Sequence, residues 1–170
     1  PTETLKAKLY SGSLDIAFLD ESLSDADLGS LPCWTQELCL IVNKRHPLAK
    51  QNTVSLNDLK GHYLISYDLN EPLGKTLASL IDGKPLQVGY RYKDEITLAS
   101  IVLANPDVMA LSCQSWLLKA YTDEVRFLSV EEAPKDFRQL YIVYRLSALQ
   151  NEAVCEFLEL AKELFLPSKF

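Results

Sequence analysis

The chain has 170 residues, of which 48% are hydrophobic and 24% charged, with a formal net charge of −6. This composition is typical of a globular protein with a buried core. The acidic balance argues against uniform nucleic-acid binding, which needs a basic face that displaces counterions from phosphates. We find no apolar run near the roughly 20 residues of a membrane span, and no signal peptide. The four cysteines form no C-x-x-C pair, so we do not expect a metal centre. A reducing, cytoplasmic setting fits these cysteines best.

The first part of the chain predicts one helix and two buried strands. Residues 2–10 suit a helix, with two leucines four residues apart on one face. Residues 14–19 and 38–42 are apolar on both faces, as in strands that are covered on both sides. Asp15 stands near the start of the first of these strands, where its carboxylate can bond backbone N–H groups of the turn. We therefore interpret Asp15 as structural.

The middle of the chain alternates between helices and strands. Ser55 and Asp58 resemble a capping box that opens a single helical turn over residues 55–59. Residues 63–67 and 86–92 read as strands, and residues 73–81 between them read as a helix.

The last part continues this alternation. Asp94 is a good N-cap for a helix that begins at Glu95 and ends near Ala104. Asn151 caps a long final helix whose apolar residues recur at spacings of three and four. Between them we predict strands at 108–111, 125–130 and 140–144, and a short helix at 116–121.

Strands that alternate with helices predict an α/β fold with a largely parallel sheet. Two polar stretches, near residues 68–72 and 131–136, divide the sequence into lobes joined by two crossings. We expect one lobe to contain residues 1–67 and 135–170, and the other to contain residues 68–134. Two lobes joined in this way provide a hinge and a place for a small ligand.

Several motifs, in order along the chain, resemble the LysR-type transcriptional regulators. The stretch "LYSGSLDIA", residues 9–17, is similar to that family's L-x-x-G-x-L-D-h-A signature. Glu37 and the "HPLA" run at 46–49 are similar to a second signature, and "VSLNDLKGHYLISY" to a third. The resemblance covers nearly the whole chain and concerns the effector-binding domain. The family's winged helix-turn-helix domain and its first strand would precede Pro1.

The resemblance implies a type 2 periplasmic-binding-protein-like fold, with two Rossmann-like lobes that each hold a mixed, mostly parallel sheet. It also implies a small-molecule effector in the cleft between the lobes, and no cofactor. The free N–H groups and positive dipole end of the helix that begins at Glu95 could bind a carboxylate of such an effector. A homodimer is implied, with helices 2–10 and 96–104 facing each other, and a tetramer in the full-length protein. DNA would be bound only through the N-terminal domain, and we expect no membrane contact.

One segment departs from the family pattern. Residues 105–110, "NPDVMA", replace the family's G-x-G, and Leu111-Ser112 replace its L-P. This region borders the effector pocket in the family, so no ligand class can be carried over. The effector, the target genes and the direction of regulation stay open.

Strand ends and helix N-termini are the expected effector contacts, because both present groups at the crevice of an open α/β sheet. Thr97 is the leading candidate, since its counterpart in the family often faces the pocket. For Thr2 a simple capping role, and for Asp20 ordinary loop polarity, are alternatives that stay open. The candidate effector-binding residues are Thr2, Leu19, Asp20, Ser66, Tyr67, Glu95, Ile96, Thr97 and Ser112.

Two other functions share this fold. If the chain were a solute-binding protein, we would expect an export signal and few free thiols. The sequence shows no signal peptide and has four scattered cysteines. A small enzyme predicts clustered arginines or a reactive residue, whereas neither His46 nor His62 lies in a recognised nucleophile motif. We therefore predict that the chain is not an enzyme and that it has no catalytic residue and no metal ligand. Cys113 is alone in its lobe, so a redox role would require an intermolecular or small-thiol disulfide.

Overall fold

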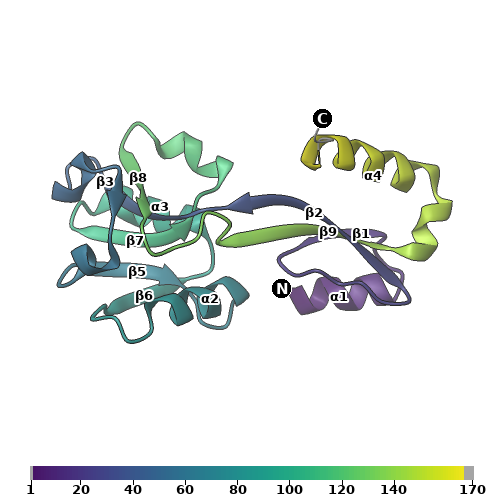
Figure 1. The fold of residues 1–170 in the computed structure, drawn as a ribbon. Coiled ribbons are helices and arrows are strands. Elements are labelled where there is room, and N and C mark those ends of the chain that lie inside the picture. The colour runs from purple at the N-terminus through teal and green to yellow at the C-terminus, as the bar shows by residue number, and fades with distance from the viewer. Residues whose placement is uncertain (1, 167–170) are drawn as a thin grey trace. The chain divides into compact units, whose positions relative to one another are not determined.

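The computed structural model describes residues 2–166 and divides into two compact units. Unit 1 contains the chain up to Thr35 and the chain from Gln139, and unit 2 contains Gln36–Arg138. Figure 1 shows the elements of each unit. No helix within the described residues is long and apolar enough to cross a membrane.

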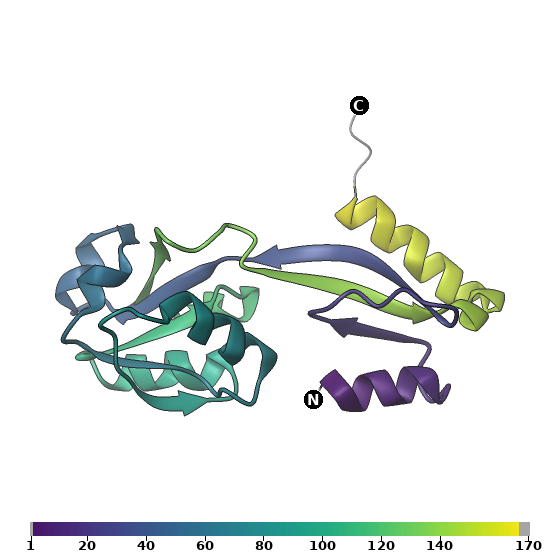
Figure 2. The same ribbon diagram turned by 60° about the horizontal axis from the view of Figure 1, so that its bottom comes forward.

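Unit 1 is a three-stranded sheet with a helix on each face. The strands are β1 (Ile16–Leu19), β9 (Arg138–Arg145) and β2 (Leu28–Gln36), in the order β1-β9-β2, and β1 pairs antiparallel with β9. Figures 1 and 2 place α1 (Thr2–Tyr10) and α4 (Glu152–Phe165) on opposite sides of this sheet. The 3-10 helix η4 (Leu146–Gln150) links β9 to α4.

Asp15 is structural, although its partner is not the one predicted. Its carboxylate pairs with the guanidinium of Arg145, with 3.1 Å between Oδ1 and Nη2. The backbone N–H of Arg145 also donates to the carbonyl of Asp15, at 3.0 Å. Asp15 therefore ties the start of β1 to the end of β9.

Unit 2 is built on a mixed six-stranded sheet. Two strands, β3 and β7, lie at its centre, and β3 runs antiparallel to both β7 and β8. The pairs β4·β8, β5·β7 and β5·β6 are parallel. The order of the strands is β4 (Thr53–Val54), β8 (Val125–Val130), β3 (Leu38–Asn43), β7 (Val108–Cys113), β5 (Tyr63–Tyr67) and β6 (Val88–Tyr92). The helices are η1 (Pro47–Lys50), η2 (Leu56–Leu59), α2 (Pro72–Ile81), α3 (Glu95–Ala104) and η3 (Trp116–Tyr121).

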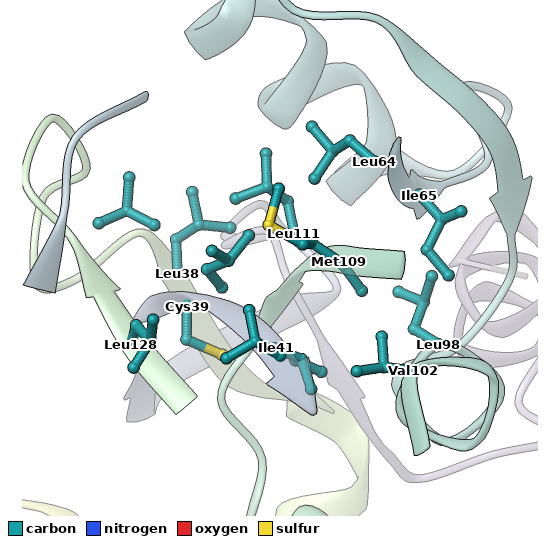
Figure 3. Packing of buried hydrophobic residues seen from close by; sticks show 14 of the residues in the cluster. Leu38, Cys39, Ile41, Leu64, Ile65, Leu98, Val102, Met109, Leu111 and Leu128 are labelled. Atoms are coloured by element: carbon teal, nitrogen blue, oxygen red, sulfur yellow. The ribbon is translucent and has the colours of Figure 1, made fainter. Parts of the chain in front are cut away.

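The core of unit 2 forms around β3, whose six residues are all buried. Figure 3 shows Leu98 and Val102 of α3 among the side chains of β3, β5 and β7. Helix α3 is apolar around most of its surface, which is typical of a helix that packs closely against a sheet.

A buried asparagine fastens the far end of α3 to the sheet. Asn43, the last residue of β3, donates from Nδ2 to the carbonyls of Leu103 (3.1 Å) and Val102 (3.4 Å). Its Oδ1 accepts from the backbone N–H of Arg45 at 3.0 Å. The last carbonyls of a helix have no partner within the helix. Asn43 therefore supplies partners at the C-terminal end of α3 and joins that end to β3.

The observed units differ from the predicted lobes at the first boundary. The prediction placed residues 36–67 with the chain ends, but β3 pairs with β7 and β8, and β5 pairs with β7. These ladders make the segment part of unit 2. The polar stretch at 68–72 is a loop between β5 and α2 of that same unit, and the crossing lies at Thr35–Gln36. At the second boundary the crossing lies at Arg138–Gln139, four residues beyond the predicted position.

Candidate functional site

Two parallel strands of unit 2 end side by side. Because β5 and β7 run in the same direction, their last residues lie at the same edge of the sheet, where open α/β sheets place their ligands. We call Ser66, Tyr67, Ser112 and Cys113 the strand-end cluster. All four side chains are buried. The first turn of α3 lies close by, since the charge of Glu95 affects the pKa of both Tyr67 and Cys113.

Hydrogen bonds hold the strand-end cluster together. The hydroxyls of Tyr67 and Ser112 lie 2.8 Å apart and share a hydrogen bond. The backbone N–H of Cys113 donates to the Tyr67 hydroxyl at 3.1 Å, and the Ser66 hydroxyl donates to the carbonyl of Leu111, also at 3.1 Å. A buried polar group without a partner is costly, and here the three hydroxyls satisfy one another and the backbone. The cluster is thus an ordered set of buried polar groups at this edge of the sheet.

The phenol and the thiol of the cluster are both kept neutral. Burial is the largest cause that raises the pKa of Tyr67, followed by the charge of Cys113. Burial also raises the pKa of Cys113 to about 12, although the positive charge of Arg138 acts in the opposite direction. A reactive cysteine needs thiolate character and exposure, and Cys113 has neither. These properties argue against the redox role that the sequence left open.

The N-terminus of α3 already holds a carboxylate. Asp94 accepts from the backbone N–H of Thr97 at 2.8 Å through Oδ1, and from the Thr97 hydroxyl at 3.0 Å through Oδ2. The predicted N-cap is therefore confirmed. Both groups of Thr97 that could meet a ligand are engaged by Asp94. Glu95 adds a second negative charge in the same turn, so this helix end is less favourable for an anion than an uncapped one.

Two arginines that are not among the predicted site residues lie near this edge. Arg91 is half-buried, pairs in register with Ser66, and donates from Nη1 to the carbonyl of Tyr67 at 3.2 Å. Arg138 donates from Nη1 to Oε1 of Gln36 at 3.0 Å, and its charge affects Cys113. The position of Arg91, one residue before the end of a strand parallel to β5, was the signal that could have identified it.

The remaining candidates belong to unit 1. Thr2 begins α1 and is partly exposed, Leu19 is buried at the end of β1, and Asp20 follows β1 and is half-buried. The described part of unit 2 therefore brings together Ser66, Tyr67 and Ser112, with the first turn of α3 close by. Within residues 2–166 no three His, Cys, Asp or Glu side chains are grouped as a metal ion would require.

The chain is similar to bacterial transcriptional regulators and to solved effector domains. The uncharacterized HTH-type transcriptional regulator YybE of Bacillus subtilis (strain 168) is 27% identical over 109 residues, which are 63% of this chain and 37% of that protein. The effector binding domain of QuiR in complex with shikimate has a TM-score of 0.74 and 23% identity, over 94% of this chain and 76% of that one. The CcmR regulatory domain of Synechocystis PCC6803 in complex with 2-PG has a TM-score of 0.75 and 15% identity, over 96% of this chain and 79% of that one.

These likenesses establish the fold. The chain has the two-lobe α/β architecture of type 2 periplasmic-binding proteins, with a mixed sheet in unit 2 and the antiparallel pair β1·β9 in unit 1. It spans little more than a third of the length of YybE. The family model of the LysR substrate binding domain matches residues 1–166, and the chain therefore belongs to that family.

Proposed function

We propose that this chain is the ligand-sensing domain of a LysR-type transcriptional regulator and binds a small-molecule effector. The strand-end cluster supports this proposal most directly, because it places buried, ordered hydroxyls where two parallel strands end. The family match and the effector-bound relatives agree with it. Catalysis is not proposed, since the phenol and thiol of the cluster are neutral and buried.

The charges around the cluster restrict the chemistry of the effector. Asp94 and Glu95 disfavour an anion at the start of α3, whereas Arg91 supplies a cation at the end of β6. A guanidinium binds carboxylates well because its donors match the two oxygens. We therefore propose that any carboxylate of the effector faces Arg91, and that hydroxyl or amino groups face α3. QuiR, whose structure contains shikimate, is a relative consistent with such a ligand.

The wider arrangement is proposed from the family pattern. Thr2, Leu19 and Asp20 of unit 1 would complete the site, so that the effector lies between the two lobes and favours one arrangement of them. Helices α1 and α3 would face each other in a homodimer, with a tetramer in the full-length regulator. DNA would be bound in the cytoplasm by a separate N-terminal domain of the regulator.

A thermal-shift screen tests the proposal. Hydroxy acids, other small carboxylates and amino acids would be added to the domain, because a ligand at 100 times its Kd adds about 2.7 kcal/mol of stability. For any hit, the variants Ser112→Ala and Arg91→Gln should reduce the shift, and Thr76→Val on the exposed face of α2 should not. A hit whose shift is the same in all three variants binds elsewhere, and would disprove the assigned site.

A further inference from the structure

A cavity lies at the edge of the sheet of unit 2 that is opposite the strand-end cluster. Its volume is about 740 Å³, within the range of cavities that hold small ligands. It opens where β5 and β6 begin, whereas the strand-end cluster lies where β5 ends. Figure 1 shows these two strands side by side. The five residues of β5 separate the two places by about 13 Å, at 3.3 Å per residue. The side chains that line the cavity include Lys60, His62, Tyr63, Lys84, Leu86 and Gln87.

The cavity is positively charged in a chain whose net charge is −6. Lys60 and Lys84 line it, and no acidic residue does. Neither lysine forms a salt bridge among the described residues. The charge of Lys84 reaches Glu132, but the carboxylate oxygens of Glu132 accept from the backbone N–H of Leu56 and from the Ser55 hydroxyl. Both ammonium groups are therefore available to a ligand.

Two glycines, Gly61 and Gly89, line the cavity, and Gly83 lies directly before the lining residue Lys84. Gly61 and Gly83 have φ values of 81° and 69°, so each turns the chain in a conformation that other residues rarely adopt, directly beside Lys60 and Lys84. The ring of Tyr63 lies against Gly89, where an added Cβ would come within 3.0 Å of it. The ring of Tyr63 therefore packs against the backbone of Gly89, and Gly61 and Gly83 allow the turns that bring the two lysines to the cavity.

We propose that this cavity is a second binding site, which takes a small multivalent anion such as a phosphate ester or a polycarboxylate. Two ammonium groups on separate loops match a ligand with two or more negative charges. Gln87 and His62 can add hydrogen bonds, and Tyr63 offers a flat surface to the remainder of the ligand. The site differs from the effector site in its place and in its residues, so either can exist without the other.

Calorimetric titration with inorganic pyrophosphate and, separately, with citrate tests this inference. The double variant Lys60→Gln/Lys84→Gln should weaken binding about tenfold or more, the effect of losing two exposed charge contacts. The control Lys8→Gln/Lys75→Gln removes two exposed lysines elsewhere and should bind as the unaltered protein does. Stronger binding of pyrophosphate than of citrate would point to phosphate esters, and the reverse to polycarboxylates.

Three outcomes would overturn the inference. One is the absence of saturable binding of either anion in the millimolar range. The second is an equal loss of binding in the control variant, which would show a general effect of charge. The third is a loss of binding in Arg91→Gln, which would place the anion at the strand-end cluster. Circular dichroism of each variant confirms that a loss of binding is not a loss of folding.

Discussion

Removal of the Tyr67 hydroxyl tests the strand-end cluster most sharply. The change Tyr67→Phe deletes the hydrogen bond to Ser112 and leaves the N–H of Cys113 without its acceptor in a buried place. A lost hydrogen bond costs about 1 kcal/mol, and a buried unsatisfied donor costs about 1–3 kcal/mol. We therefore expect Tyr67→Phe to lower the free energy of unfolding by about 2–3 kcal/mol. The change Ser112→Ala should lower it by about 1 kcal/mol.

The double variant measures the coupling between the two hydroxyls. Because each single change already breaks their shared hydrogen bond, the double variant should be less destabilised than the sum by about 1 kcal/mol. Urea unfolding provides the measurement. Trp116 belongs to unit 2 and the other tryptophan, Trp34, to unit 1, so fluorescence in a Trp34→Phe background reports unit 2 alone.

A matched control makes this result decisive. Tyr90 is 65% exposed, and Tyr90→Phe removes the same atom from solvent instead of from the core. That change should alter stability by less than about 0.5 kcal/mol. If Tyr67→Phe costs no more than Tyr90→Phe, or if the double variant is simply additive, the cluster is not the coupled network described above.

Three further predictions concern other parts of the chain. Burial, followed by the charge of a neighbouring imidazole, lowers the pKa of His46 below 6.5. The folded state therefore binds a proton at the His46 imidazole less readily than the unfolded state does, and stability should decrease as the pH falls below about 6.5. The variant His46→Asn keeps a capping acceptor and should reduce that decrease. Urea titrations at several pH values provide the measurement. Gly74→Ala should destabilise the protein by about 1–3 kcal/mol in thermal unfolding, because the added Cβ would lie within 2 Å of the Asp68 carbonyl. This is expected although alanine favours helices. Unchanged stability would show that the loop at Asp68 moves to make room. A thiol reagent should modify the half-buried Cys155 well before Cys113 in the native state, and equal rates in mass spectrometry would contradict the buried placement of Cys113.

Regular periodicity made most elements predictable. The helices at 2–10, 73–81 and 95–104 and the strands at 38–42, 63–67 and 125–130 agree with the structure within about one residue. Their apolar residues follow a helical or strand period, and caps such as Asp94 fix their ends. Strand β2 was missed because "LGSLPCWTQ" contains glycine and proline, which are depleted in strands.

Long-range pairing was the part that local patterns could not show. The polar stretch 68–72 looked like a crossing, yet polarity marks any surface loop. The true crossing lies within the nearly continuous run of β2 and β3, where only the exposed Glu37 interrupts the strand. The site shows the same limit. Ser66 and Tyr67 lie at the end of their strand as predicted, but the hydrogen bond between Tyr67 and Ser112 joins residues 45 positions apart.

The side chain of Asn43 holds one end of α3 to the sheet. Its two bonds to the carbonyls of Val102 and Leu103 attach the end of the helix to the central strand, while the other end begins beside the strand-end cluster. We expect a ligand that contacts the first turn of α3 to displace that end of the helix more than the end held by Asn43.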